Sequence, residues 1–115
     1  MNTDNRRYDI RGIREEKLFI KVASCRTQPF IEKMTLKSST LDISASGMRL
    51  LVTKEIPVGT ILDMWVEIKG NPGKFLLQGK VMWSSTQNDE YLCGVELVDT
   101  SEDLSDLVRW QTLFK

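Results

Sequence analysis

The chain has 115 residues, of which 41% are hydrophobic, and this size and composition suit one domain with a single hydrophobic core. Sixteen Lys and Arg residues balance sixteen Asp and Glu residues, so the formal net charge at pH 7 is zero. A neutral chain disfavours polyanionic partners such as nucleic acid polymers or anionic membranes. Any site for an anion must therefore be local.

Cysteine and histidine usage argues against a metal site. The chain has no histidine, and Cys25 and Cys93 form no CxxC pair, so a zinc site would lack its usual ligands. We expect buried, reduced thiols, with a disulfide as the alternative. Residues 1–4 do not begin a signal peptide, and no apolar run approaches the roughly 18 residues of a membrane span. These features predict a soluble, cytoplasmic protein without membrane insertion.

Residues 1–16 are charged and lack apolar periodicity, which predicts a flexible basic arm. Over residues 1–26, seven cations and four carboxylates give a local net charge of +3. The arm contains Arg7 and Arg11, separated by the residues Tyr-Asp-Ile. Guanidinium groups bind phosphates and guanine acceptor edges through paired donors. A solvated arm without a ligand is the alternative interpretation.

The body of the chain alternates apolar and polar residues with a period of two, which predicts β-strands. The clearest example is a segment in which Leu62, Met64, Val66 and Ile68 share one face. The Gly-Asn-Pro-Gly sequence that follows predicts a hairpin turn. The predicted strands are residues 17–25, 34–44, 48–53, 60–69, 75–83 and 91–97. Such short strands predict a six-stranded antiparallel barrel or sandwich over residues 17–99, and a closed or split barrel would leave the fewest exposed edges.

Beyond the strands the apolar period changes to three and four residues, which predicts an amphipathic α-helix over residues 101–114. Its apolar residues are Leu104, Leu107, Val108, Trp110 and Phe114. We expect this face, with Trp110, to pack on the barrel, and a partner-binding surface is the alternative. The expected fold is therefore a single domain, all-β with one terminal helix.

A second polar pattern, Asp-Ile-Ser-Ala-Ser-Gly, begins at Asp42, where a predicted strand ends. Alternation places Asp42 and Ser44 together on the outer face, and the next strand places Arg49 on the same side. Gly47 suits a corner that needs a positive φ or close approach of a ligand to the backbone. An ordinary Asx or Ser turn is the alternative interpretation of this corner.

Arg-x-x-x-Arg followed by Asp-x-Ser-x-x-Gly resembles the PilZ domain family. The sequences Gly-Lys-Val-Met-Trp at 79–83 and Cys-Gly-Val-Glu-Leu at 93–97 also resemble its two closing strands, so the resemblance runs from Arg6 to the final helix. The span 26–39 is longer and less regular than the pattern. The resemblance implies a six-stranded antiparallel barrel with a C-terminal helix. It further implies a receptor for the bacterial second messenger cyclic di-GMP, with no catalysis and no other cofactor.

The resemblance also implies roles for the motif residues. Arg7 and Arg11 would grip phosphate and guanine acceptor edges. Asp42 and Ser44 would hydrogen-bond a guanine, and Gly47 would let the ligand approach the backbone. These roles agree with guanine chemistry, because O6 and N7 accept from a guanidinium group while N1 and N2 donate to a carboxylate.

Three further residues complete the candidate ligand-binding set. Arg6 precedes the first motif arginine, and in domains resembling this one an arginine there accompanies binding of a stacked pair of messenger molecules. Arg49 shares the outer face of the second motif. Trp83 shares a strand face with Leu77 and Val81, which favours a core aromatic, and a base-stacking platform beside the ligand is the alternative.

The expected function is that of a receptor whose arm closes over cyclic di-GMP and which signals in trans to an unidentified effector protein in motility, biofilm or virulence control. A ligand-independent adaptor using the terminal helix or the outward Trp65 face is the second hypothesis. A barrel that binds single-stranded nucleic acid is the third, and zero net charge and few outward aromatics disfavour it. An enzyme is the weakest, because histidine and a phosphate-binding GxxxxGK loop are both missing from the sequence.

Overall fold

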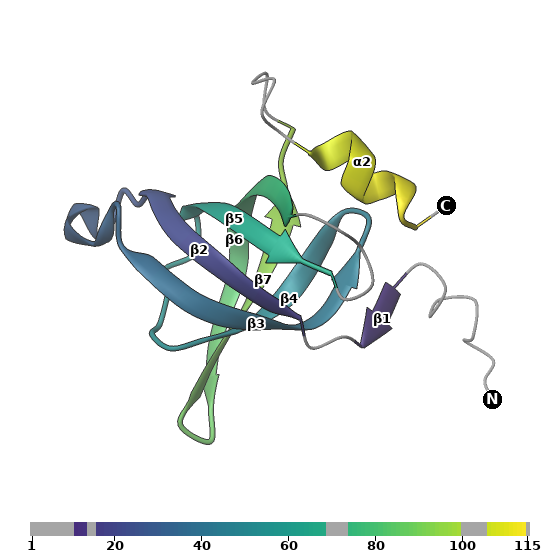
Figure 1. The fold of residues 1–115 in the computed structure, drawn as a ribbon. Helices are drawn as coiled ribbons and strands as arrows, with labels where there is room; N and C mark the ends of the chain where they lie inside the picture. Colours follow the sequence, from purple (N-terminus) through teal and green to yellow (C-terminus); the bar gives the residue numbers. More distant parts are fainter. Residues whose placement is uncertain (1–10, 14–15, 69–73, 100–105, 115) are drawn as a thin grey trace.

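The structure is a computed structural model that describes residues 11–13, 16–68, 74–99 and 106–114, with the backbone alone for 11–13. Figure 1 shows a β-barrel with a short helix beyond one end. The strands are β1 (Arg11–Ile13), β2 (Lys17–Ser24), β3 (Thr35–Ser44), β4 (Gly47–Val52), β5 (Ile61–Glu67), β6 (Lys74–Gln87) and β7 (Glu90–Leu97). A 3-10 turn, η1 (Pro29–Ile31), and a helix, α2 (Leu107–Thr112), complete the described elements.

Six strands close into a ring through antiparallel pairing. The order is β3-β2-β5-β6-β7-β4, and the pairing of β3 with β4 joins its two ends. This arrangement confirms the six-stranded antiparallel barrel with a terminal helix. Closure removes the exposed edges that an open sheet of this size would carry.

The short strand β1 was not predicted, because three residues are too few to show alternation. It pairs with the end of β3, so the arm is strand-like where it reaches the barrel. Residues 1–10 and 14–15 of the predicted arm lie outside the described residues.

The core follows the predicted alternation in β5. Leu62, Met64 and Val66 are fully buried, while Trp65 between them is half-buried on the outer face. Burying each such side chain contributes roughly 1.5–3 kcal/mol. Cys25 and Cys93 are both buried and unpaired, as expected.

The β6–β7 hairpin is longer than predicted. Alternation was expected to end at Trp83, but β6 continues to Gln87 and β7 begins at Glu90. Asn88 and Asp89 both have positive φ values, 51° and 66°, as a tight two-residue hairpin turn requires. The polar end of the hairpin projects beyond the other strands (Figure 1). Because this end has no buried face, its residues show no apolar alternation, and the sequence did not predict how far the two strands extend.

The helix α2 is shorter than the predicted 101–114, and residues 101–105 lie outside the described residues. Trp110 is fully buried and meets the ring of Phe75 edge-on at 5.3 Å, so the expected packing on the barrel is confirmed. Val108, predicted for the same apolar face, is instead 78% exposed. The reason is that a helix of six residues presents only a narrow face to the barrel. Within the described part of the chain no helix has the length and apolarity needed to cross a membrane.

Candidate functional site

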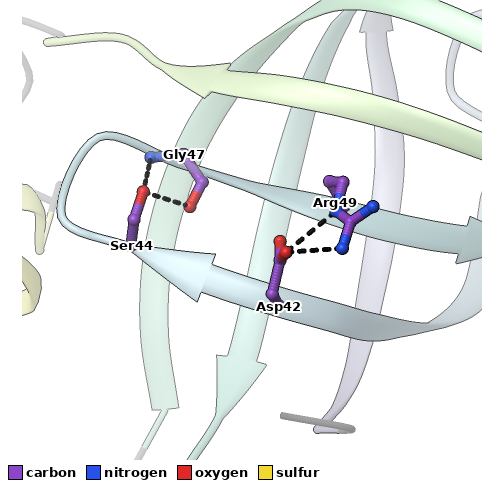
Figure 2. Close-up of polar contacts among 4 residues, drawn as sticks. All are labelled: Asp42, Ser44, Gly47 and Arg49. Carbon is purple, nitrogen blue, oxygen red and sulfur yellow. Dashed lines mark hydrogen bonds and ion pairs between the residues drawn. The ribbon is translucent and has the colours of Figure 1, made fainter. Parts of the chain in front are cut away.

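The corner between β3 and β4 is closed by the Ser44 side chain. The Ser44 hydroxyl accepts a hydrogen bond from the Gly47 N–H and donates one to the Gly47 carbonyl, both at 3.1 Å (Figure 2). The Ser-turn alternative therefore describes what Ser44 does at this corner. Because a hydroxyl has one donor hydrogen and two acceptor lone pairs, Ser44 can still accept one bond from a ligand.

The structure gives Gly47 a physical reason that the sequence did not suggest. Among the described glycines only Gly59 has a positive φ, so the positive-φ explanation for Gly47 is wrong. A Cβ on Gly47 would overlap the carbonyl oxygen of Val95 on the neighbouring strand β7. The position therefore requires glycine because the β7 backbone approaches it closely.

Asp42 and Arg49 form the charged part of the corner. They are direct partners across β3 and β4, and Arg49 lies on the Asp42 side as alternation predicts. Arg49 Nε and Nη2 both contact Asp42 Oδ2, at 2.8 Å and 2.7 Å (Figure 2). This hydrogen bond raises the pKa of the Arg49 guanidinium group. The Asp42 side chain is 7% exposed and that of Arg49 is 47% exposed, so the pair reaches from the barrel wall to solvent.

A β-bulge in β3 changes which residues the corner buries. The register of β3 against β4 shifts between Thr40 and Asp42, so Leu41 is an extra residue. Leu41 is only half-buried, whereas Thr40, Asp42 and Ile43 are buried. Asp42 lies on the same side of the hairpin as Arg49, as expected, but it is buried there, with 5% of its surface exposed.

Trp83 lies on the surface beside this corner. The register of β6 against β7 shifts between Val81 and Trp83, and this second bulge turns both Met82 and Trp83 outward. Trp83 is 41% exposed and Met82 is 48% exposed, so the interpretation of Trp83 as a core residue is wrong. A Cβ on Gly94 would overlap the Trp83 indole, which shows that the ring lies directly over the Gly94 backbone.

These residues surround one pocket of about 240 Å³. Its lining comes from strands β3, β4, β6 and β7 and consists of Asp42, Ser44, Ser46, Gly47, Met48, Arg49, Met82, Trp83, Gly94, Val95 and Glu96. The predicted Asp42, Ser44, Gly47, Arg49 and Trp83 are thus brought together. Sequence reasoning missed the contribution of β7, because the pairing of Gly47 with Glu96 joins distant parts of the chain.

The first motif reaches the same corner through its backbone. Arg11 is the pairing partner of Ser44, and Ile13 is the partner of Asp42. Strand β1 therefore runs beside the second motif. Arg6 and Arg7 lie outside the described residues, so their positions remain predictions.

The described residues contain no group of three or more His, Cys, Asp or Glu side chains able to hold a metal ion. The pocket instead offers two carboxylates, those of Asp42 and Glu96, together with the Arg49 guanidinium group, two serine hydroxyls and an exposed indole. This set suits a planar polar base or an anion that carries one.

The sequence profile of the PilZ domain matches residues 5–112 of the chain. No curated protein matches its sequence. The fold is similar to that of the Bacillus subtilis inhibitor of motility MotI (DgrA), with a TM-score of 0.68 and 11% identity over 91% of this chain; the chain spans 46% of that protein. It is also similar to the PilZ domain of YcgR from Escherichia coli, solved with c-di-GMP, with a TM-score of 0.59 and 17% identity over 87% of this chain and 79% of that one.

Proposed function

The chain belongs to the PilZ domain family, and from this premise and the geometry of the β3–β4 corner we propose that it is a receptor for cyclic di-GMP. It acts in the cytoplasm and signals in trans to an effector protein, in motility, biofilm or virulence control. The observation that carries the proposal is the pocket that gathers Asp42, Arg49 and Trp83 beside the strand containing Arg11. Two similar structures add support, one of an inhibitor of motility and one of a domain solved with c-di-GMP.

The pocket chemistry suits guanine. A guanine ring presents N1 and N2 donors on one edge, which the Asp42 carboxylate accepts, and O6 and N7 acceptors on the other. Two of the five Arg49 N–H groups bond Asp42, so the other three suit guanine acceptors or a phosphate. Ser44 accepts one further bond at the same edge.

Trp83 supplies the face of the site. Its indole is exposed and is backed by the Gly94 backbone, so a base can stack on its outer side without displacing core residues. Arg7 and Arg11 then close over the phosphates from the arm, and Arg6 supports binding of a second, stacked messenger molecule. Ordering the arm costs conformational entropy, which the charge-assisted bonds must exceed.

A ligand-independent adaptor is the second candidate, because Val108 on α2 is 78% exposed and the outer face of β5 carries the half-buried Trp65. These surfaces lie on elements outside the pocket lining. An effector that binds equally with and without cyclic di-GMP, and that is lost on Val108→Glu, would favour the adaptor.

Calorimetric titration tests the proposal. Cyclic di-GMP should bind the wild-type chain, whereas cyclic di-AMP, whose adenines lack the guanine N2 donor and O6 acceptor, should bind much more weakly. Asp42→Ala should lose the preference for guanine. The matched control is Asp63→Ala, which removes a carboxylate on β5 that accepts a hydrogen bond from Gln78 and does not line the pocket. Absence of heat with cyclic di-GMP at tens of micromolar would contradict the proposal.

A further inference from the structure

The terminal helix contacts the ligand corner through one buried side chain. Trp110 is fully buried, with its ring against Phe75 at 5.3 Å and Phe114 at 5.5 Å. Its indole Nε1 donates a hydrogen bond of 2.9 Å to the carbonyl oxygen of Ser44, which is 66 positions away in the sequence. The only polar atom of the Trp110 side chain thus donates its hydrogen bond to Ser44, the residue that closes the β3–β4 turn.

Ser44 is consequently a junction of several elements. Its hydroxyl bonds both backbone groups of Gly47, its backbone lies opposite Arg11 of β1, and its carbonyl accepts from α2. Two residues on, the Ser46 carbonyl accepts from the Leu97 N–H at 2.8 Å. The turn that lines the pocket is therefore fixed from the arm, from β7 and from the helix.

The helix itself is attached to β6 rather than held by Trp110 alone. The Asp106 N–H donates to the Leu76 carbonyl at 2.9 Å, and the Leu76 N–H donates to Asp106 Oδ2 at 2.7 Å. Arg109 lies 4.0 Å from the centre of the Phe75 ring and donates to the Lys74 carbonyl at 2.9 Å. Because α2 is attached at β6, the Trp110 bond links β6 and the helix to the far corner of the barrel.

We propose that Trp110 is a positioning residue for the ligand corner and that occupancy of the pocket is coupled to docking of α2. This inference rests on the proposed function, because it concerns the same pocket. The indole holds the Ser44 carbonyl, and through it the orientation of the Ser44 hydroxyl and the Gly47 backbone. A ligand that contacts this turn binds the arrangement in which α2 is docked.

Thermodynamic linkage makes the coupling reciprocal. If the docked helix strengthens ligand binding by some factor, the ligand stabilises helix docking by the same factor. The Trp110 indole N–H should therefore exchange more slowly in the bound state, and loss of this donor should weaken the binding of cyclic di-GMP. Trp110→Phe removes one buried hydrogen bond to the Ser44 carbonyl, so it should raise the Kd by roughly three- to tenfold.

The test uses two variants and one measurement on the wild-type chain. Trp110→Phe removes the Nε1 donor and keeps a ring against Phe75. Its control, Phe114→Leu, removes ring packing against Trp110 without touching the bond to Ser44. Calorimetry with cyclic di-GMP gives the Kd of each, and thermal unfolding gives stability. NMR hydrogen exchange of the Trp110 indole N–H is followed in the wild type with and without saturating cyclic di-GMP.

The expected result is a weaker affinity for Trp110→Phe only, even if Phe114→Leu is equally destabilised, together with slower indole exchange in the saturated wild type. A wild type that binds while its indole exchange stays unchanged would overturn the coupling and leave the proposed function intact. Equal affinities of Trp110→Phe and the wild type for cyclic di-GMP would also overturn the coupling and leave the proposed function intact. If Trp110→Phe does not fold, the wild-type exchange decides. If the wild type does not bind at all, the proposed function fails and the coupling with it.

Discussion

Replacement of Trp83 by alanine separates ligand binding from stability more cleanly than any other change at this site. The indole is 41% exposed and lies over the Gly94 backbone, outside the buried core, so its removal should leave the core of the barrel unchanged. Truncation should therefore cost little stability. It should remove the face on which a guanine stacks.

The size of the effect follows from stacking energies. Base stacking on an aromatic side chain contributes roughly 1–3 kcal/mol per base. At about 1.4 kcal/mol per tenfold change in Kd, Trp83→Ala should weaken cyclic di-GMP roughly 5- to 150-fold. Trp83→Phe keeps a smaller ring, so its Kd for cyclic di-GMP should lie between that of the wild type and that of Trp83→Ala.

Calorimetry and intrinsic fluorescence measure this prediction together. The ligand should quench Trp83 emission in the wild type, and the quenching should disappear in Trp83→Ala. The matched control is Trp65→Ala on the outer face of β5, which is not among the residues that line the pocket. Equal affinities of Trp83→Ala and wild type would refute the stacking role, as would an equal loss in Trp65→Ala.

Three further changes test other parts of the account. Arg7→Ala or Arg11→Ala should weaken cyclic di-GMP by roughly ten- to a hundredfold by calorimetry, from about 1–3 kcal/mol per bidentate contact, and unchanged affinity in both would remove the arm from the site. Gly94→Ala should displace the Trp83 indole, visible as a shifted emission maximum and a weaker ligand, and wild-type behaviour in both would contradict the close packing. Burial raises the pKa of Cys93 to about 12, above the ordinary value of 9.0, so stability should fall as the pH rises above about 9, because the unfolded thiol ionises first. Urea unfolding between pH 8 and 10 measures this, and Cys93→Ala should flatten the dependence.

The strands that face the core on one side were predictable, because burial imposes a period of two. Leu62, Met64 and Val66 share the buried face of β5 as their spacing indicated. The closed antiparallel barrel was also predicted, because the chain has many short strands linked by turns. What failed was local: bulges at Leu41 and Met82 each insert one residue and reverse the alternation beyond it.

The candidate site shows the same division. Asp42 and Arg49 were predicted to share a patch, because both positions follow from the register of one hairpin. For Trp83, a candidate ligand-binding residue, a core position was favoured over a stacking platform, because the β6 bulge has no sequence signal of its own. The reason for Gly47, the Val95 carbonyl of β7, depends on a strand pair far apart in the chain. The bond from Trp110 to Ser44 likewise required coordinates, since periodicity identifies a buried face but not a hydrogen-bond partner.

A titration of ¹⁵N-labelled protein with cyclic di-GMP, followed by NMR, tests the central claim most directly. The account predicts that amides of residues 42–49, 82–83 and 94–96 shift together with those of the arm at 5–12, and that all saturate at one molar ratio. Shifts confined to other surfaces of the barrel, with residues 42–49 unmoved at saturation, would contradict it.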